Sequence, residues 1–156
     1  MRNHALVVCR DGEVICIGGS NRDGQCEVPP LPFNVRYVCA AAGLLHSVFV
    51  RSDGKAMAVG DDFHGQCRIP LLPEGVEYVS AAAGDSHTIL LRSDGQVETC
   101  GDNANEQCLI PALPDGVVYT VIAAGSHHSL LIRSDGTAVA CGYNDHGQCT
   151  VRTPER

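Results

Sequence analysis

Short apolar runs separated by glycine, proline and aspartate make up most of this 156-residue chain. Between residues 76 and 111 the β-tolerant runs are 76–80, 87–92, 96–100 and 107–110. Ser93-Asp94-Gly95 separates the second run from the third, and Asp-Gly between two strands favours a hairpin because glycine supplies the positive φ of such turns. No ten-residue stretch free of glycine and proline has helical periodicity. The pattern predicts an all-β unit of four short strands.

This unit recurs along the whole chain. Gln-Cys pairs at residues 25, 66, 107 and 148 are spaced by 41, and so are the Asp-Gly pairs after the first one. We divide the single domain 1–156 into approximate repeats at 1–43, 44–84, 85–125 and 126–156. A four-stranded repeat of about 40 residues is the size of one β-propeller blade.

Three motifs carry a family resemblance: Ala-Ala-Gly-x-x-His, Arg-Ser-Asp-Gly and Cys-Gly-x-Asn-x-x-Gly-Gln. Together they resemble the regulator of chromosome condensation repeat over essentially the whole chain. The resemblance implies a β-propeller, usually of seven blades with four-stranded sheets around a central axis. The third repeat departs from the pattern at Glu106, where the other three repeats have glycine.

The number of strands is too small for a closed ring. Four His-to-Gln-Cys segments accompany only three Tyr-to-Ala-Ala-Gly strands, which amounts to about 3.8 units. We therefore expect an incomplete, open propeller arc whose terminal blades lack caps and expose apolar faces or unpaired strand edges. Three alternatives follow: the chain is a fragment of a longer propeller, it associates with itself, or it docks on another protein.

Residues at repeated positions are expected to be structural. The repeated histidines lie one blade apart, too far to converge on one metal, and we expect each ring to bond the backbone of its own blade. The repeated glycines serve the Asp-Gly turns, and the repeated cysteines pack as small apolar side chains. These positions are His4, His46, His87 and His128; Gly54, Gly95 and Gly136; and Cys26, Cys67, Cys108 and Cys149.

Candidate contacts with a partner lie where loops break the repeat. Three aromatic residues sit beside glycine or proline without recurring, two histidines occupy one loop position in different repeats, and the third repeat carries six acidic residues against one arginine. An acidic blade suits a basic partner. The candidates are Phe33, Phe63, Tyr143, His64, His146, Asp102 and Glu106.

The nine cysteines do not form a recognisable metal site, because their number is odd and no C-x-x-C occurs. We expect an intracellular, reducing compartment; in an oxidising one, Cys100 with Cys108 and Cys141 with Cys149 are candidate disulfides. No nucleophile elbow, phosphate-binding loop or His-Glu-x-x-His motif is present. We therefore expect no catalytic residues, no metal and no cofactor. Thiol or zinc chemistry at the two cysteine pairs is the remaining enzymatic alternative.

Charge and hydropathy exclude further classes. The net charge of −7 has the wrong sign for binding nucleic-acid phosphates. The richest apolar stretch, residues 37–50, is too short to span a bilayer. The sequence thus predicts a non-catalytic protein-interaction or scaffold module, an accessory structural subunit of a larger assembly. The alternative is a fragment of a regulatory propeller, either resembling nucleotide-exchange factors or recruiting substrates to a ubiquitin ligase.

Overall fold

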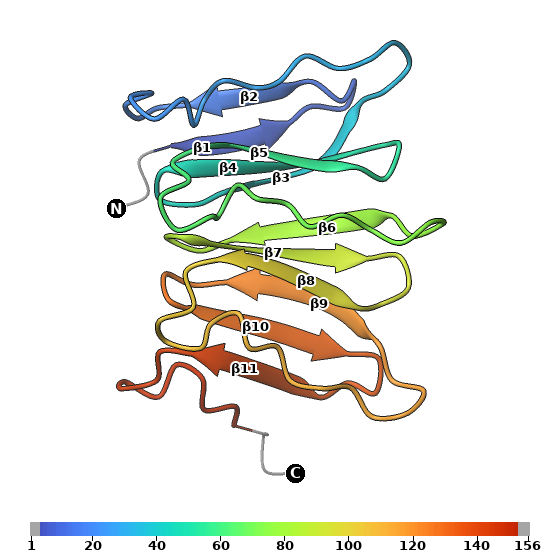
Figure 1. The fold of residues 1–156 in the computed structure, drawn as a ribbon, viewed down its shortest axis with the longest axis vertical. Helices are drawn as coiled ribbons and strands as arrows, with labels where there is room; N and C mark the ends of the chain where they lie inside the picture. Colours follow the sequence, from blue (N-terminus) through green and yellow to red (C-terminus); the bar gives the residue numbers. More distant parts are fainter. Residues whose placement is uncertain (1–3, 153–156) are drawn as a thin grey trace.

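Four antiparallel sheets follow one another along the molecule in the computed structural model, which describes residues 4–152. Figure 1 shows them stacked along the long axis, from β1–β2 at one end to β9–β11 at the other. The prediction of an all-β, open arc of blades is confirmed. The strands are β1 (Ala5–Val8), β2 (Val14–Ile17), β3 (Tyr37–Ala42), β4 (His46–Arg51), β5 (Ala56–Gly60), β6 (Tyr78–Ala83), β7 (His87–Arg92), β8 (Val97–Gly101), β9 (Tyr119–Ala124), β10 (His128–Arg133) and β11 (Ala138–Gly142).

Each three-stranded sheet places the histidine strand in the middle. In the second sheet β4 pairs with β3 on one side and β5 on the other, with His46 opposite Gly60 and Val50 opposite Ala56. The β4–β5 turn closes when the Gly54 N–H donates to the Arg51 carbonyl at 3.0 Å, and Gly54 has a φ of +75°. Among the residues that the structure describes, the first sheet consists of β1 and β2 and has no counterpart of β3.

The fourth strand expected in each blade does not form, and that prediction was wrong. Residues 107–110 join no sheet, because loop side chains bind the backbone there. The Cys108 N–H donates to the Asn103 side-chain oxygen at 2.9 Å, and the Gln107 amide donates to Asp102 at the same distance. The Gln-Cys segment therefore belongs to a polar loop rather than to a strand.

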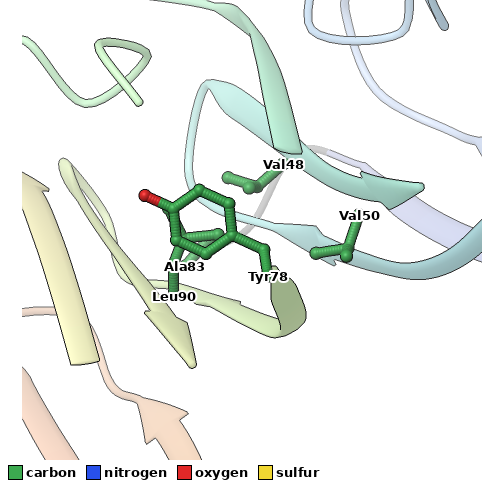
Figure 2. Packing of buried hydrophobic residues seen from close by; sticks show 5 residues of the cluster. All are labelled: Val48, Val50, Tyr78, Ala83 and Leu90. Carbon is green, nitrogen blue, oxygen red and sulfur yellow. The ribbon is translucent and has the colours of Figure 1, made fainter. Parts of the chain in front are cut away.

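The core lies between consecutive sheets. Val48 and Val50 of β4 pack against Tyr78, Ala83 and Leu90 of the third sheet, as Figure 2 shows. Leu91, Tyr119 and Leu131 form the equivalent cluster between the third and fourth sheets. Both of these junctions thus bury one apolar face from each of two neighbouring sheets.

Backbone hydrogen bonds also cross each junction. The amides of Tyr37, Tyr78 and Tyr119 donate to the carbonyls of Gly12, Gly54 and Gly95 in the preceding sheet, at 3.1, 2.8 and 2.9 Å. A Cβ on Gly54 would lie 2.3 Å from the Glu77 side chain. Glycine is required here both by its backbone conformation and by the close approach of the next sheet.

Candidate interaction surfaces

A histidine and a hydroxyl join each pair of neighbouring sheets. His4, His46 and His87 place Nε2 at 2.7, 3.0 and 3.2 Å from the hydroxyls of Ser47, Thr88 and Ser129, which belong to the following sheet. The prediction that each ring bonds the backbone of its own blade was wrong in this respect. The sequence shows the recurrence, but finding the partner requires knowing how the sheets stack.

The same hydroxyls make a second bond back to the preceding sheet. Ser47, Thr88 and Ser129 donate to the carbonyls of Gln25, Gln66 and Gln107 at 2.6, 2.8 and 2.6 Å. A hydroxyl has one proton to donate, so it must accept from the histidine, which therefore carries its proton on Nε2. Each hydroxyl links two groups of the preceding sheet, and we call this arrangement the His–hydroxyl–Gln bridge.

Burial keeps at least one of these rings neutral. Desolvation lowers the pKa of His87 to about 4. The nearby rings of His127 and His128 lower this pKa further, whereas the carboxylates of Asp102 and Asp85 act to raise it. Within residues 4–152 no group of three or more histidine, cysteine or acidic side chains is placed to hold a metal ion. His87 therefore acts as a neutral hydrogen-bond donor inside the stack.

The cysteines are arranged differently from the expected pairs. A disulfide joins Cys16 of β2 to Cys26, whereas Cys100, Cys108, Cys141 and Cys149 are free thiols. Successive strand residues point to opposite faces, so Cys100 reaches back to the Gln66 carbonyl at 3.5 Å while Thr99 faces the Cys108 carbonyl at 3.3 Å. The pairs Cys100–Cys108 and Cys141–Cys149, expected as candidates in an oxidising compartment, therefore do not form in this structure.

Burial also makes the free thiols poor nucleophiles. It raises the pKa of Cys67 to about 12 and the pKa values of Cys100 and Cys141 to about 11. At neutral pH these groups remain protonated, and the thiolate is the reactive form. The arrangement offers no support for thiol chemistry at these positions.

The loop residues proposed as partner contacts divide between the two ends of the sheets. Phe63 stands beside His64 with ring centroids 5.0 Å apart, and Tyr143 beside His146 at 6.0 Å, both in loops that follow the third strand of a blade. Phe33 is 92% exposed in the linker at the opposite end. The structure therefore separates Phe33 from the other candidates.

Asp102 and Glu106 lie in one loop of the third blade. Asp102 accepts hydrogen bonds from the Ala104 amide and the Gln107 side chain, which lower its pKa although partial burial acts to raise it. Glu106 is exposed and adopts a φ of +64°, close to the +82° of Gly65 at the equivalent position. The glutamate thus keeps the loop conformation that glycine gives the other repeats.

The open face of the last sheet is apolar. Leu91 in the third sheet is covered by the fourth sheet and is 7% exposed. Its equivalent in the fourth sheet, Ile132, is 39% exposed, and Val121, which is paired with Ile132, is 48% exposed. We call the face formed by Val121, Ala123, Leu130, Ile132, Ala138 and Ala140 the trailing face; its members occupy the positions with which the second sheet packs on the third.

The open face of the first sheet is apolar as well. Ala5 lies opposite Ile17 and Val7 opposite Ile15, all on one side of the β1–β2 pair. Val7, Ile15 and Ile17 are 44%, 51% and 54% exposed. We call these four residues the leading face. Sequence reasoning named no residue of either face, although alternation within the terminal repeats carries the signal.

The sequence comparisons match the repeat motifs. The family model of the regulator of chromosome condensation (RCC1) repeat matches two segments in the second half of the chain, residues 78–107 and 119–148. These segments contain the Ala-Ala-Gly-x-x-His and Arg-Ser-Asp-Gly motifs, which also occur in the second sheet. The third and fourth sheets are thus similar to regulator of chromosome condensation repeats.

Solved structures share the arrangement of these repeats. Prp20p from Saccharomyces cerevisiae, studied for binding to Gsp1p and histones, is 25% identical with a TM-score of 0.76 over 95% of this chain and 43% of its own. The CRINKLY WD40 ectodomain of the Arabidopsis thaliana receptor kinase ACR4 has 19% identity and a TM-score of 0.68, over 92% of this chain and 51% of its own.

Human WBSCR16 is similar in fold, at 20% identity and a TM-score of 0.66 over 76% of this chain and 38% of its own. This chain therefore spans about half or less of the length of each of these structures. No curated protein sequence matches it. Among residues 4–152 there is no helix of the length and hydrophobicity that crossing a membrane requires.

Proposed function

We propose that this chain is a non-catalytic interaction module, an accessory or scaffold subunit that binds another protein through the apolar faces of its terminal sheets. The supporting observation is the exposure of Ile132 and Val121 at positions whose internal equivalents are covered by the next sheet. Exposed apolar faces of this kind mark interaction sites. In repeat proteins each unit buries its faces only against its neighbours, so an outside surface must cover the terminal ones.

The leading face supports the same proposal from the other end. Val7, Ile15 and Ile17 form an uncovered apolar surface, and β1 has a partner strand on only one side within the described residues. A partner that adds a strand to this edge would satisfy backbone groups as well as cover apolar side chains.

The loops provide a second, polar layer of contact in this proposal. Phe63, His64, Tyr143 and His146 project from loops at one end of the blades, and Asp102 and Glu106 add negative charge there. These residues would set specificity and orientation, favouring a partner with basic groups, while the terminal faces supply most of the buried area. Phe33 would contact the same partner only if it reaches the opposite end.

The second candidate is a regulatory propeller of which this chain forms part. Prp20p is described as binding Gsp1p and histones, and this chain corresponds to 43% of its length. An exchange-like or substrate-recruiting activity would then belong to the full ring. The two candidates differ in what covers the terminal faces, since further blades of one longer polypeptide would do so in the second case.

The mass of the native complex tests the proposal. Size-exclusion chromatography with light scattering should show the purified chain associating with itself or with its native partner. The double variant Val121→Asp/Ile132→Asp should abolish association through the trailing face and remain folded. The matched control is Val38→Asp/Val79→Asp, because these valines are 48% and 45% exposed on strands but lie outside both open faces.

A stable, non-aggregating monomer with a cooperative melt and no partner would contradict the proposal. Equal loss of association in the control variant would contradict the role of the trailing face. Recovery of the chain as part of one longer polypeptide would favour the regulatory candidate.

We also propose an intracellular, reducing compartment for the chain. Support comes from the seven cysteines of the described residues that remain thiols, whereas the Cys16–Cys26 disulfide of this structure stands against it. Differential alkylation of the protein taken from its source would test this, and a Cys16–Cys26 bond intact in that sample would contradict it.

A further inference from the structure

The His–hydroxyl–Gln bridge is complete at every internal junction and half-complete at the trailing end. The His128 ring and the Gln148 carbonyl occupy the positions of the His87 ring and the Gln107 carbonyl, but neither has a hydrogen-bond partner among residues 4–152. His128 is partly exposed, whereas His46 and His87 are fully buried. The Gly136 carbonyl likewise lacks the tyrosine amide that its equivalents Gly54 and Gly95 receive.

These three groups specify what a covering surface must offer. Beside the apolar trailing face it needs one hydroxyl, placed to accept from the histidine and donate to the Gln148 carbonyl, and one backbone N–H for Gly136. A histidine donor and a carbonyl buried without these partners would cost free energy. The sheets that follow the internal junctions provide both, through Ser47, Thr88 or Ser129 and through the amide of the repeated tyrosine.

The chain's own leading face lacks the hydroxyl. The residue after His4 is Ala5, at the position of Ser47, Thr88 and Ser129, and the face it shares with Val7, Ile15 and Ile17 is wholly apolar. Docking this face on the trailing face of a second copy would bury His128 and the Gln148 carbonyl without their common partner.

Resting on the proposed function, we propose that the trailing face binds a β-sheet of another propeller repeat that carries serine or threonine after its histidine, and that it discriminates against a second copy of this chain, which has Ala5 there. The apolar side chains of the trailing face supply affinity, and the half-complete bridge supplies selectivity, because a partner without the hydroxyl leaves two buried polar groups unpaired.

Restoring the hydroxyl on the leading face tests this rule with the full chain. Threonine and valine have the same shape and differ in the hydroxyl, and Thr88 shows that the bridge accepts threonine. In sedimentation equilibrium, Ala5→Thr should assemble about tenfold more tightly than Ala5→Val. In chains that also carry His128→Ala, the difference between the two should shrink markedly.

Thr88→Val calibrates the same bond inside the stack, where loss of the hydroxyl should lower stability without changing assembly. Thermal melts of all variants check that they fold, and Ala5 is exposed, so its replacements should leave the sheet intact. Equal assembly of Ala5→Thr and Ala5→Val, including no assembly of either, would overturn the hydroxyl rule. Wild type assembling as tightly as Ala5→Thr, or a difference unchanged by His128→Ala, would overturn it too.

The two proposals fail separately. A native partner lost on Val121→Asp/Ile132→Asp, together with no coupling between residues 5 and 128, leaves the proposed function standing and removes the hydroxyl rule. Coupling between residues 5 and 128 in a chain that has no native partner would support the hydroxyl rule and remove the proposed function.

Discussion

Single side chains at the junctions act on two sheets at once. The hydroxyl of Thr88 accepts from His46 and donates to the Gln66 carbonyl, so its loss leaves two buried groups of the neighbouring sheet unpaired. Removing one partner of a buried hydrogen bond costs more than the bond itself contributes. Residues of modest size therefore control how firmly adjacent blades are joined.

The buried neutral ring of His87 makes stability sensitive to mild acid. The pKa of His87 is about 4 in the folded chain and 6.5 ordinarily, so the unfolded chain binds the extra proton between these values. The contribution is fully present above pH 6.5 and is lost as the pH falls toward 4. Urea denaturation should show a loss on the order of 2 kcal/mol between pH 7 and pH 5.

The carboxylates with lowered pKa values, such as Asp94 and Asp102, lose their contribution only below pH 3.8, outside this window. A His87→Gln variant should flatten the dependence between pH 7 and pH 5. A wild-type free energy of unfolding that is constant over this range would show that the ring is not buried and neutral.

The glutamate in the third loop is a second residue with a measurable effect. Glu106 has a positive φ where Gly24, Gly65 and Gly147 occupy the same position. A left-handed backbone costs a side-chain-bearing residue roughly 1–2 kcal/mol. Glu106→Gly should raise the free energy of unfolding by about 1 kcal/mol in urea denaturation, and Gly65→Glu should lower it comparably. An unchanged or lower stability of Glu106→Gly would mean that the glutamate side chain compensates for the strain.

At the level of strands and loops, the sequence predicted most elements and missed their partners. The β-tolerant runs and Asp-Gly turns correspond to the strands and hairpins, because alternation and turn chemistry are local. The run at 107–110 failed as a strand: the Cys108 N–H, which a strand would pair with a neighbour, donates to the Asn103 side chain, and the Gln107 side chain is held by Asp102. The bridges escaped prediction because they join residues about 42 positions apart, whose contact depends on sheet stacking.

The disulfide shows the same limit in one element. Cys26 has an equivalent cysteine in every blade. The position of its partner Cys16, however, is occupied by Ala58, Thr99 and Ala140 in the other three blades, so only the first blade can form this bond. Opening it should cost roughly 3 kcal/mol through the closed loop of the unfolded chain. A Cys16→Ser variant should show this loss relative to the oxidised wild type in chemical denaturation, and a control in reducing buffer should remove the difference. Equal stability of the two oxidised chains would contradict the link.

For the whole molecule, stability is distributed along one dimension. Each sheet contacts mainly the sheets before and after it, so the second and third sheets have two neighbours and the terminal ones have one. Hydrogen exchange should therefore protect the amides of β4 and β7 most and those of β2 and β11 least. The measurement is exchange mass spectrometry on the isolated chain; uniform protection of all four sheets would indicate a single cooperative unit.

The constant spacing of the bridges also affects how such a gene can change. Each bridge joins a histidine to a hydroxyl one residue more than a full repeat away: 43 residues in the first repeat, which is 42 residues long, and 42 in the next two, which are 41 long. Duplicating or deleting one whole repeat in frame therefore places a histidine donor and a hydroxyl acceptor together at the new junction. A duplication or deletion of any other length places them out of register. Recombination between repeats would then produce arrays of different length that still fold. A repeat that carries alanine in place of the hydroxyl, as Ala5 does here, could not form the bridge with the repeat placed before it.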